Sequence, residues 1–316
     1  MADFKKRIKA YESAYVPLGK FEEDNNIQYI RMIDVGRLII QHRLQGFLAS
    51  GIQSFLSTFH LSPRQIWITR HGRSEDNLVN KIGGDSNLTD TGRDYSIALY
   101  NFIGLKRKEW EDDQATRLQQ ANSSIPGTCT PPHPDLRSDL DEKNFCVWTS
   151  MLKRSIQTAQ EFAEDENFDV KAWEMLNELD AGNFEGLSYE KIAEEHPVEY
   201  AKRKADKLNY TYPGVGGEGY LQVIGRVRDL VREIERIKDH VLIIGHRSVC
   251  RVLMAYFMGL DREDVPNLYV PLNMLYSIEP KPYGMEFHAY QYDENTCEFN
   301  HLPDYNPRKQ AVGHQD

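Results

Sequence analysis

The sequence predicts an α/β fold, a three-layer α/β/α sandwich with a mostly parallel central sheet. Three short apolar runs support this prediction, at residues 66–69, 146–149 and 240–244. Each has the length of a strand, and the third is apolar almost throughout, as expected for a strand buried on both faces. Each run is followed directly by polar residues and then by apolar residues at helical spacing. Strand, polar turn and helix, repeated three times, are typical of a mostly parallel sheet covered by helices.

The first sixty residues are expected to form one strand and one long helix. Residues 29–35 alternate in polarity and end at Gly36, which predicts a strand. From Arg37 to His60 apolar residues recur at helical spacing, and Pro63 ends the segment. This piece is too small for a domain of its own. We therefore expect residues 1–62 to dock on a main domain at residues 63–302.

Two further stretches lack a periodic pattern. Between Trp110 and Lys143, prolines lie among Ser, Thr, Asp and Gln, which indicates a long mobile insertion at about 110–143. The last stretch, residues 303–316, is polar and is expected to fray.

The bulk composition excludes several functional classes. The formal net charge of −10 argues against nucleic acid or anionic membrane as a partner, although a pocket can be basic inside an acidic protein. No apolar run approaches the roughly 18 residues of a membrane span, and the first residues lack the apolar core of a secretory signal. The four scattered cysteines favour free thiols in a reducing cytosol. We therefore expect a cytoplasmic protein.

Basic and imidazole side chains follow the three predicted strands. They are Arg70 and His71 after the first strand, Lys153 and Arg154 after the second, and His246 and Arg247 after the third. Ligands of open α/β sheets bind beyond the carboxyl ends of the strands, so these side chains should converge on one crevice. Guanidinium groups bind phosphate oxygens in bidentate fashion, and neutral imidazole is a competent nucleophile at phosphorus. One histidine after a strand is more often structural, whereas two in matching contexts favour a phosphoryl-transfer site.

No metal and no cofactor is expected at this site. The sequence contains no His-x-x-His pair, no paired aspartates beside a phosphate loop and no Gly-x-x-x-x-Gly-Lys-Ser/Thr loop. It therefore predicts neither metal-assisted hydrolysis nor ATP-driven chemistry.

The motifs around these residues resemble those of the histidine phosphatase (phosphoglycerate mutase-like) superfamily. Arg-His-Gly at 70–72 with a late Gly-His at 245–246 is the short signature. Longer runs at 70–77, 82–86, 149–159 and 176–182 resemble the fructose-2,6-bisphosphatase branch, and the likeness spans about 62–292. Residues 7–18 and 29–36 look like the last strand and helix of that branch's kinase domain. Residues 1–62 are thus identified as the C-terminal remnant of a kinase-like domain, whose nucleotide-binding part is absent from this chain.

The resemblance implies the catalytic roles. His71 would be the residue that is phosphorylated, and His246 would be its partner across the pocket. Glu178 would be the general acid for the departing sugar oxygen and then the base for water. This role is reasonable because a trianionic phosphoryl group raises the pKa of a neighbouring carboxyl. Without the Asn-Glu-Leu-Asp-Ala-Gly match around it, Glu178 would be taken for an ordinary surface carboxylate.

The resemblance also implies the substrate contacts. The 2-phosphate would be held by Arg70, Asn77 and Arg154. The 6-phosphate and sugar would contact the backbone at Gly83 and the side chains of Tyr189, Arg203, Lys207, Tyr220 and Arg251. For the pair Arg203 and Lys207, four residues apart on a charged helix expected over 199–209, a solvated helix face is the competing interpretation.

Two positions depart from the family pattern. Arg73 stands where the family usually has Glu, and Arg247 where it usually has Gln. Both arginines add positive charge near the phosphates. They could tighten anion binding, change the choice of substrate or slow product release, and the sequence does not rank these effects.

The leading hypothesis is a phosphatase that hydrolyses the 2-phosphate of fructose 2,6-bisphosphate through a phosphohistidine. The alternatives are the same mechanism on another phosphorylated sugar or metabolite, and a module that senses a sugar phosphate with weak or no turnover. A branched-acid-phosphatase interpretation fits less well because Ser74 and Arg247 occupy its signature positions. A phosphoglycerate mutase interpretation is weaker because the 83–85 and 189–220 regions look like the bisphosphatase. The expected partner is a small sugar bisphosphate; a kinase domain outside this chain and a homodimer are left open.

Overall fold

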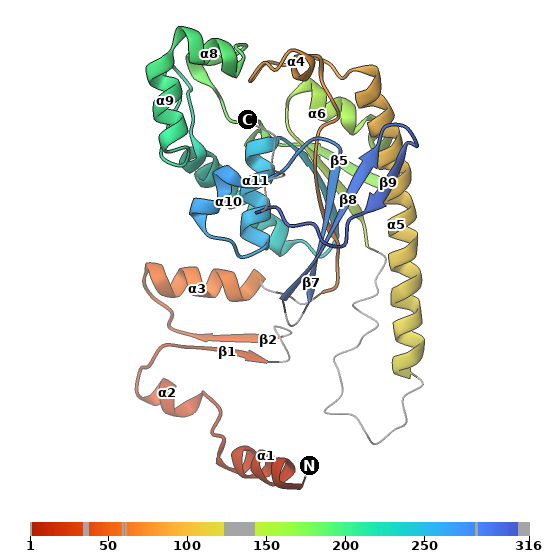
Figure 1. Ribbon diagram of the computed structural model, residues 1–316. Helices are drawn as coiled ribbons and strands as arrows, with labels where there is room; N and C mark the ends of the chain where they lie inside the picture. Colours follow the sequence, from red (N-terminus) through yellow and green to blue (C-terminus); the bar gives the residue numbers. More distant parts are fainter. Residues whose placement is uncertain are drawn as a thin grey trace. The chain divides into compact units, whose positions relative to one another are not determined.

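The computed structural model describes residues 2–33, 38–58, 60, 62–122, 143–281 and 284–308. These residues belong to two compact units, Met1–Leu61 and Ser62–Asp316 (Figure 1).

The larger unit is built on a seven-stranded sheet with the order β5-β4-β6-β3-β7-β8-β9. Its strands are β3 (Ile66–Arg70), β4 (Phe145–Thr149), β5 (Phe168–Ala172), β6 (His240–Gly245), β7 (Met274–Lys281), β8 (Gly284–Asp293) and β9 (Glu298–His301). Strands β5, β4, β6 and β3 are parallel, whereas β7, β8 and β9 add in antiparallel fashion. The three strands predicted from apolar runs are β3, β4 and β6, which are neighbours in the parallel part.

Helices cover both faces of this sheet, so the predicted three-layer α/β/α class is confirmed. The helices are α4 (Glu75–Leu78), α5 (Asp90–Asn122), α6 (Lys153–Thr158), α7 (Gln160–Ala163), α8 (Tyr189–Glu195), α9 (Pro197–Ala205), α10 (Tyr220–Arg236) and α11 (Arg247–Phe257). Every residue of β3 and β6 is buried, because α10 and α11 pack on one face and α5 on the other (Figure 1). Successive residues of β3 therefore belong to hydrophobic cores on opposite faces of the sheet: Ile66 packs toward α10 and α11, and Trp67 packs toward α5.

The irregular stretch expected from residue 110 begins later than the sequence predicted. Helix α5 continues to Asn122, and the Trp110 ring lies edge-on to His240 with centroids 4.4 Å apart. Trp110 and Gln114 are buried, because they extend the row of Tyr95, Leu99 and Ile103 along one face of the helix. The rest of the predicted insertion, residues 123–142, and the end of the polar tail, residues 309–316, lie outside the described residues.

The smaller unit contains a hairpin where the sequence predicted helix. Its elements are α1 (Ala2–Ala14), α2 (Lys20–Asp24), β1 (Tyr29–Ile33), β2 (Leu38–His42) and α3 (Phe47–Thr58). The expected helix from Arg37 is therefore wrong from Leu38 to Gly46: β2 pairs antiparallel with β1, in register from Tyr29↔His42 to Ile33↔Leu38. Positive φ angles at Arg43 (49°) and Gly46 (97°) separate β2 from the helix, so one continuous helix is impossible here.

None of the helices in the described part of the chain has the length and apolarity needed to cross a membrane.

Candidate active site

The two predicted histidines meet because their strands are neighbours. Strands β3 and β6 pair in parallel with Arg70 opposite Gly245, so His71 and His246 leave the sheet at the same level. The His71 amide donates to the Gly245 carbonyl at 3.0 Å, which extends the pairing by one step. The two imidazole centroids lie 5.0 Å apart.

The side chain of His71 is fixed by both of its nitrogens. Nδ1 lies 2.7 Å from the Gly72 carbonyl oxygen; because a carbonyl only accepts, Nδ1 carries the proton. Nε2 accepts from Nε of Arg154 at 3.2 Å. Burial, together with His246, Arg154 and Arg70, holds the pKa of His71 well below its ordinary value. His71 is therefore a neutral imidazole with its lone pair on Nε2, as a nucleophile requires.

His246 lies behind His71 and is completely buried. Its Nε2 is 2.7 Å from Oγ of Ser150, the residue that follows β4. Within the described ranges its Nδ1 has no hydrogen-bond partner. Burial, followed by the charges of Arg154 and Arg70, lowers the pKa of His246 well below the usual range.

Two buried arginines stand beside the histidines. Arg154 donates from Nη1 to the Gly84 carbonyl at 2.6 Å, and Arg70 donates from Nη1 to the Val270 carbonyl at 3.1 Å. Burial and then the neighbouring charge of Arg247 lower the pKa of Arg70 to about 9. Nε of Arg70 is buried and finds no acceptor among the side chains and backbone that the structure describes. An anion beside His71 would supply one, since buried donors are rarely left unsatisfied.

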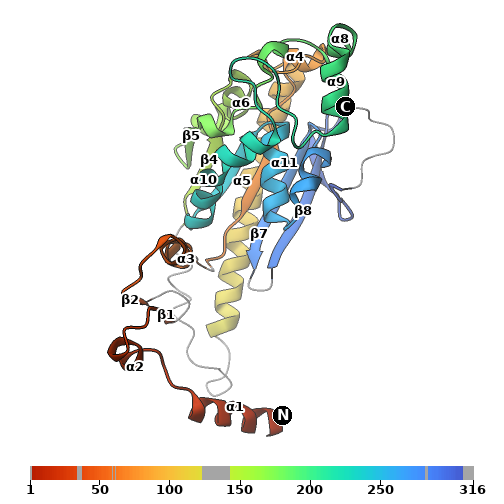
Figure 2. The same ribbon diagram turned by 90° about the vertical axis from the view of Figure 1, so that its left-hand side faces the viewer.

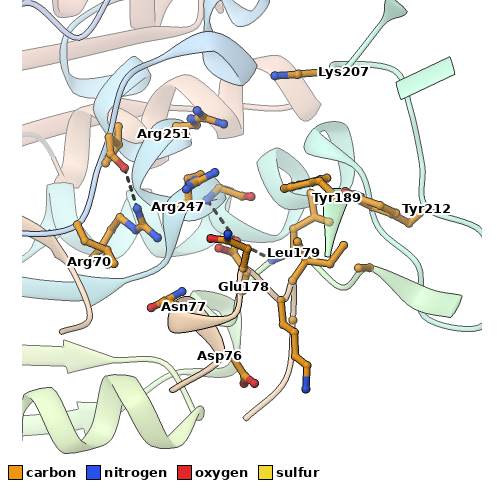
Figure 3. Close-up of a pocket in the computed structure, with 18 of the residues that line it drawn as sticks. Arg70, Asp76, Asn77, Glu178, Leu179, Tyr189, Lys207, Tyr212, Arg247 and Arg251 are labelled. Atoms are coloured by element: carbon orange, nitrogen blue, oxygen red, sulfur yellow. Dashed lines mark hydrogen bonds between the residues drawn. The ribbon is translucent and has the colours of Figure 1, made fainter. Parts of the chain in front are cut away.

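Glu178 faces this group from the loop after β5. Its Oε1 accepts from the amides of Leu179 at 2.9 Å and Ser248 at 3.2 Å (Figure 3). Burial alone would raise the pKa of Glu178, but the Leu179 amide and the charges of Arg70 and Arg154 outweigh it, and the net shift is downward. The protonated form expected for a general acid is therefore not a property of the protein side chains alone; it requires the added charge of a phosphoryl group.

These residues line one cavity of about 840 Å³. Of the predicted site residues, all line it except His246, which supports His71 from behind. Helices α4, α8 and α9 lie together at this end of the larger unit (Figure 2). The cationic side chains in the lining are Arg70, Arg73, Lys81, Arg154, Arg203, Lys207, Arg247 and Arg251. The acidic ones are Asp76, Glu178 and Glu190, so the cavity is basic within an acidic chain.

Away from His71, the cavity is lined by tyrosines and arginine. The Arg203 guanidinium lies 4.7 Å from the ring centroid of Tyr189 and 5.7 Å from that of Tyr212, and its Nη2 donates to the Tyr189 hydroxyl at 3.0 Å. Arg203 is therefore not on a freely solvated helix face. Lys207 is not on a helix at all, because α9 ends at Ala205. In Figure 3, Arg70 lies on one side of Glu178, and Tyr189 and Tyr212 lie on the other.

Tyr220 and Arg251 are a buried, hydrogen-bonded pair in the cavity lining. Arg251 donates from Nη1 to the Tyr220 hydroxyl at 2.8 Å and from Nε to the Leu268 carbonyl at 2.7 Å. Gly83 reaches the cavity with φ +73°, and a Cβ there would overlap the Glu185 carboxylate. Only glycine fits this position without displacing Glu185.

The two unusual arginines both line the cavity, in different ways. Arg73 is half exposed, with Nη1 3.9 Å from a Glu294 carboxylate oxygen. Arg247 begins α11, and its charge acts on Arg70. Asn77 also reaches the cavity, and its Oδ1 accepts from the amide and hydroxyl of Ser74, both at 3.0 Å.

Sequence reasoning missed several residues of the site, among them Ser150 and Tyr212. The Ser150 hydroxyl contacts His246 and also accepts from the Leu152 amide at 3.2 Å, directly before α6. Its position directly after a strand, like that of His71 and His246, was the available signal. Tyr212 gave no signal, because it lies outside the helices and strands and its place depends on packing against Arg203.

The described residues contain no group of three or more His, Cys, Asp or Glu side chains arranged to hold a metal ion. The fold and the oriented histidine among arginines in a basic cavity define a class of protein: an α/β phosphoric monoester hydrolase.

The comparisons identify the family. The model of the histidine phosphatase superfamily (branch 1) matches residues 135–293, and the chain belongs to this family of phosphoric monoester hydrolases. That match begins beyond His71, whose place at the site rests on the strand pairing described above. The 6-phosphofructo-2-kinase model matches residues 1–63, which confirms the kinase-like segment at the start of this chain.

Individual relatives agree with this assignment. The chain is 44% identical to 6-phosphofructo-2-kinase 1 of Saccharomyces cerevisiae, over 96% of this chain and 35% of that protein. It is 36% identical to human 6-phosphofructo-2-kinase/fructose-2,6-bisphosphatase 3, over 94% of this chain and 49% of that protein. The chain thus spans half or less of the length of these two relatives. The solved alpha-ribazole phosphatase from Shigella flexneri shares the fold, with a TM-score of 0.51 and 18% identity over 70% of this chain and 93% of that one.

Proposed function

We propose that this chain hydrolyses the 2-phosphate of fructose 2,6-bisphosphate to fructose 6-phosphate and inorganic phosphate, through a phosphohistidine at His71. The observation that carries the proposal is a single basic cavity with His71, Arg70 and Arg154 at one end and Arg203 with Lys207 at the other. Two separated cationic groups suit a sugar that carries a phosphate at each end. The human relative, whose name includes this activity, supports the same choice of substrate.

In the first step, Nε2 of His71 attacks phosphorus and the bond to the sugar oxygen breaks. Arg70 and Arg154 stabilise the charge on the transferring oxygens, since their donors are already in place around His71. Glu178, protonated once the phosphoryl group is bound, gives its proton to the departing sugar oxygen. The products of this step are a phosphohistidine and fructose 6-phosphate.

In the second step, water attacks the phosphohistidine. Glu178 is now a carboxylate and takes a proton from the water, so the step returns neutral His71 and releases phosphate. His246 lies against the His71 ring, with centroids 5.0 Å apart, and its Nε2 is bonded to Ser150, so it supports the nucleophile in both steps.

The direct test uses fructose 2,6-bisphosphate labelled at one phosphate. With label at the 2-position, a quench in base should leave acid-labile, base-stable label on the protein, and fructose 6-phosphate should be released. With label at the 6-position, the protein should stay unlabelled while the sugar product carries the label. Label on the protein from the 6-position, or release of phosphate with no labelled protein from the 2-position, would contradict the proposal.

A second candidate is a module that binds a sugar phosphate with little turnover. Arg73 and Arg247 favour it, because two added guanidinium groups in the cavity strengthen the binding of substrate and product as well as of the transition state. Calorimetry separates the two functions: heat of binding without phosphate release over hours supports the module. A screen of phosphorylated sugars for phosphate release decides whether the same chemistry serves a different metabolite.

A further inference from the structure

One guanidinium, which does not line the cavity, holds the loop that carries Glu178. Arg226, on α10, donates from Nη1 to the Met175 carbonyl at 2.6 Å. Its Nη2 donates to the Asn177 carbonyl at 2.7 Å and to the Glu178 carbonyl at 3.2 Å. Three of the four backbone carbonyls of residues 175–178 therefore accept hydrogen bonds from the Arg226 side chain.

A carboxylate holds Arg226 in turn. Glu218 accepts from Nε of Arg226 at 2.9 Å through Oε1 and from Nη2 at 3.1 Å through Oε2. Its Oε2 also accepts from the Asp180 amide at 3.2 Å, and its own amide donates to the Asp180 carbonyl at 2.9 Å. Arg226 and Glu218 thus fix the backbone on both sides of Glu178, and we call this pair the loop brace.

The loop has no regular secondary structure of its own, and side chains hold it: besides the loop brace, the Met151 amide donates to Asn177 Oδ1 at 2.9 Å and the Ala181 amide donates to Glu185 Oε1 at 2.8 Å. A 3₁₀ turn, Glu174–Leu176, precedes Glu178, and neither an α-helix nor a strand includes residues 177–181. The carboxylate itself bonds to the amide of its own neighbour, Leu179, and to that of Ser248. A general acid must lie at hydrogen-bonding distance from its proton acceptor, about 2.6–3.2 Å between heavy atoms. A misplacement of about 1 Å can cost about 10²-fold in rate.

We propose that Arg226 is a positioning residue for the general acid, acting through the backbone carbonyls of the Glu178 loop. Through it, α10 determines whether the enzyme can cleave esters whose leaving oxygen needs a proton, such as sugar phosphates. The proposal rests on the function proposed above, in which Glu178 protonates the leaving oxygen. Arg226 does not line the cavity and contacts no substrate.

The leaving group provides the test. Fructose 2,6-bisphosphate releases an alkoxide-like oxygen that needs a proton, whereas p-nitrophenyl phosphate and acetyl phosphate release stable anions that do not. For Arg226→Lys and Arg226→Met, the rate of His71 phosphorylation from the sugar should fall by about 10²-fold, the range of general acid catalysis. With the two activated compounds, the rate of His71 phosphorylation should change by less than about threefold. Both rates are measured as label bound to the protein in a single turnover. Glu178→Gln is the benchmark and should show the same pattern.

Arg232→Met is the matched control on the same helix. Arg232 is exposed and pairs with Asp229 at 3.1 Å, away from the Glu178 loop. This variant should phosphorylate His71 at wild-type rates from all three compounds. Circular dichroism and melting temperature establish that each variant is folded; where Arg226→Met is not, Arg226→Lys and Glu218→Gln carry the test.

The outcomes separate the inference from the function on which it rests. In folded Arg226 and Glu218 variants, the rate of His71 phosphorylation could fall equally for the sugar ester and for the activated compounds. That result would mean that Arg226 only supports the fold, and it would overturn the inference. If Glu178→Gln itself shows no dependence on the leaving group, or no compound labels wild-type protein, the proposed function is wrong and the inference falls with it. If the rate of His71 phosphorylation falls only for the sugar ester, both in the loop-brace variants and in Glu178→Gln, the result supports the positioning role of Arg226.

Discussion

The two ends of the cavity are built in different ways. At the phosphoryl end, His71, Arg70 and Arg154 are 3%, 6% and 4% exposed. Arg70 ends β3, His71 follows it, and Arg154 lies in the first turn of α6, the helix after β4. At the other end, Tyr189 and Arg203 belong to the short helices α8 and α9 and are only partly buried. Sheet register fixes the first group, and the packing of small helices and rings fixes the second.

This difference has a chemical counterpart. The buried donors around His71 are in place before the reaction and need little reorganisation, which suits the stabilisation of a transition state. Partly exposed side chains at the far end suit the binding of a group that does not react, and such binding acts on substrate and transition state alike. Substitutions at the phosphoryl end should therefore lower kcat, and substitutions at the far end should raise KM.

The largest expected effect is that of His71→Ala. Loss of the nucleophile should lower kcat by several orders of magnitude, while the melting temperature stays close to that of the wild type or rises. Phosphate release from fructose 2,6-bisphosphate measures the first quantity and thermal unfolding the second. A variant that keeps a tenth of wild-type activity would exclude His71 as the nucleophile.

A smaller effect of the other kind is expected for Arg203→Gln. The loss of a charged hydrogen bond to the remote phosphate, about 1.5–3 kcal/mol, should raise KM by roughly 10- to 100-fold and leave kcat within about threefold. Lys204→Gln, an exposed neighbour on α9, is the matched control and should leave both constants unchanged. If Arg203→Gln lowers kcat without raising KM, the two ends of the cavity do not differ in function as described.

Arg73→Glu combined with Arg247→Gln should weaken inhibition by inorganic phosphate by about tenfold, or roughly 1.4 kcal/mol. Both arginines line the cavity, although Arg73 already has a carboxylate, Glu294, within 3.9 Å. Inhibition constants of the wild type and the double variant decide this. Equal constants would mean that the two guanidinium groups do not act on the phosphate site.

The smallest expected change concerns protonation of His71. Because burial and neighbouring charges lower its pKa well below 6.5, the folded protein keeps this imidazole neutral as the pH falls from 8 to 5.5, whereas the unfolded chain takes up a proton near 6.5. The ¹⁵N shifts of His71 should therefore stay at their neutral values over this range. By linkage, His71 also makes the protein less stable as the pH falls below 6.5. A titration midpoint near 6.5 would show that the phosphoryl end is less desolvated than its burial implies.

The phosphoryl end could be predicted from the sequence, and much of the rest could not. His71 and His246 each lie two residues after an apolar run, and Arg154 lies five residues after another. The carboxyl ends of parallel strands must meet at one edge of the sheet. The antiparallel strands β7 to β9 and the edge strand β5 were not predicted, because their place depends on pairing with strands far away in the sequence.

The failures share a physical cause. Leu38 and Ile39 fit the helical row that continues through α3, and only the register with β1 shows that they belong to a strand. Ser150 lies 96 residues from His246, so no local pattern could connect them. Local periodicity predicts helices and strands. Which side chains lie together in the site depends on contacts between segments that are distant in the sequence.

The order of the parallel strands also bears on how the protein is made. Strand β6 lies between β4 and β3 but follows both in the chain. As the polypeptide emerges from the ribosome, β3 and β4 have no common partner until residues 240–245 are available. Neither the pairing of His71 with the Gly245 carbonyl nor the contact of Ser150 with His246 exists before then. The group of side chains around His71 is therefore completed late, when a single strand is inserted into the middle of the sheet, and a nascent chain that stops before this strand lacks His246 and these contacts.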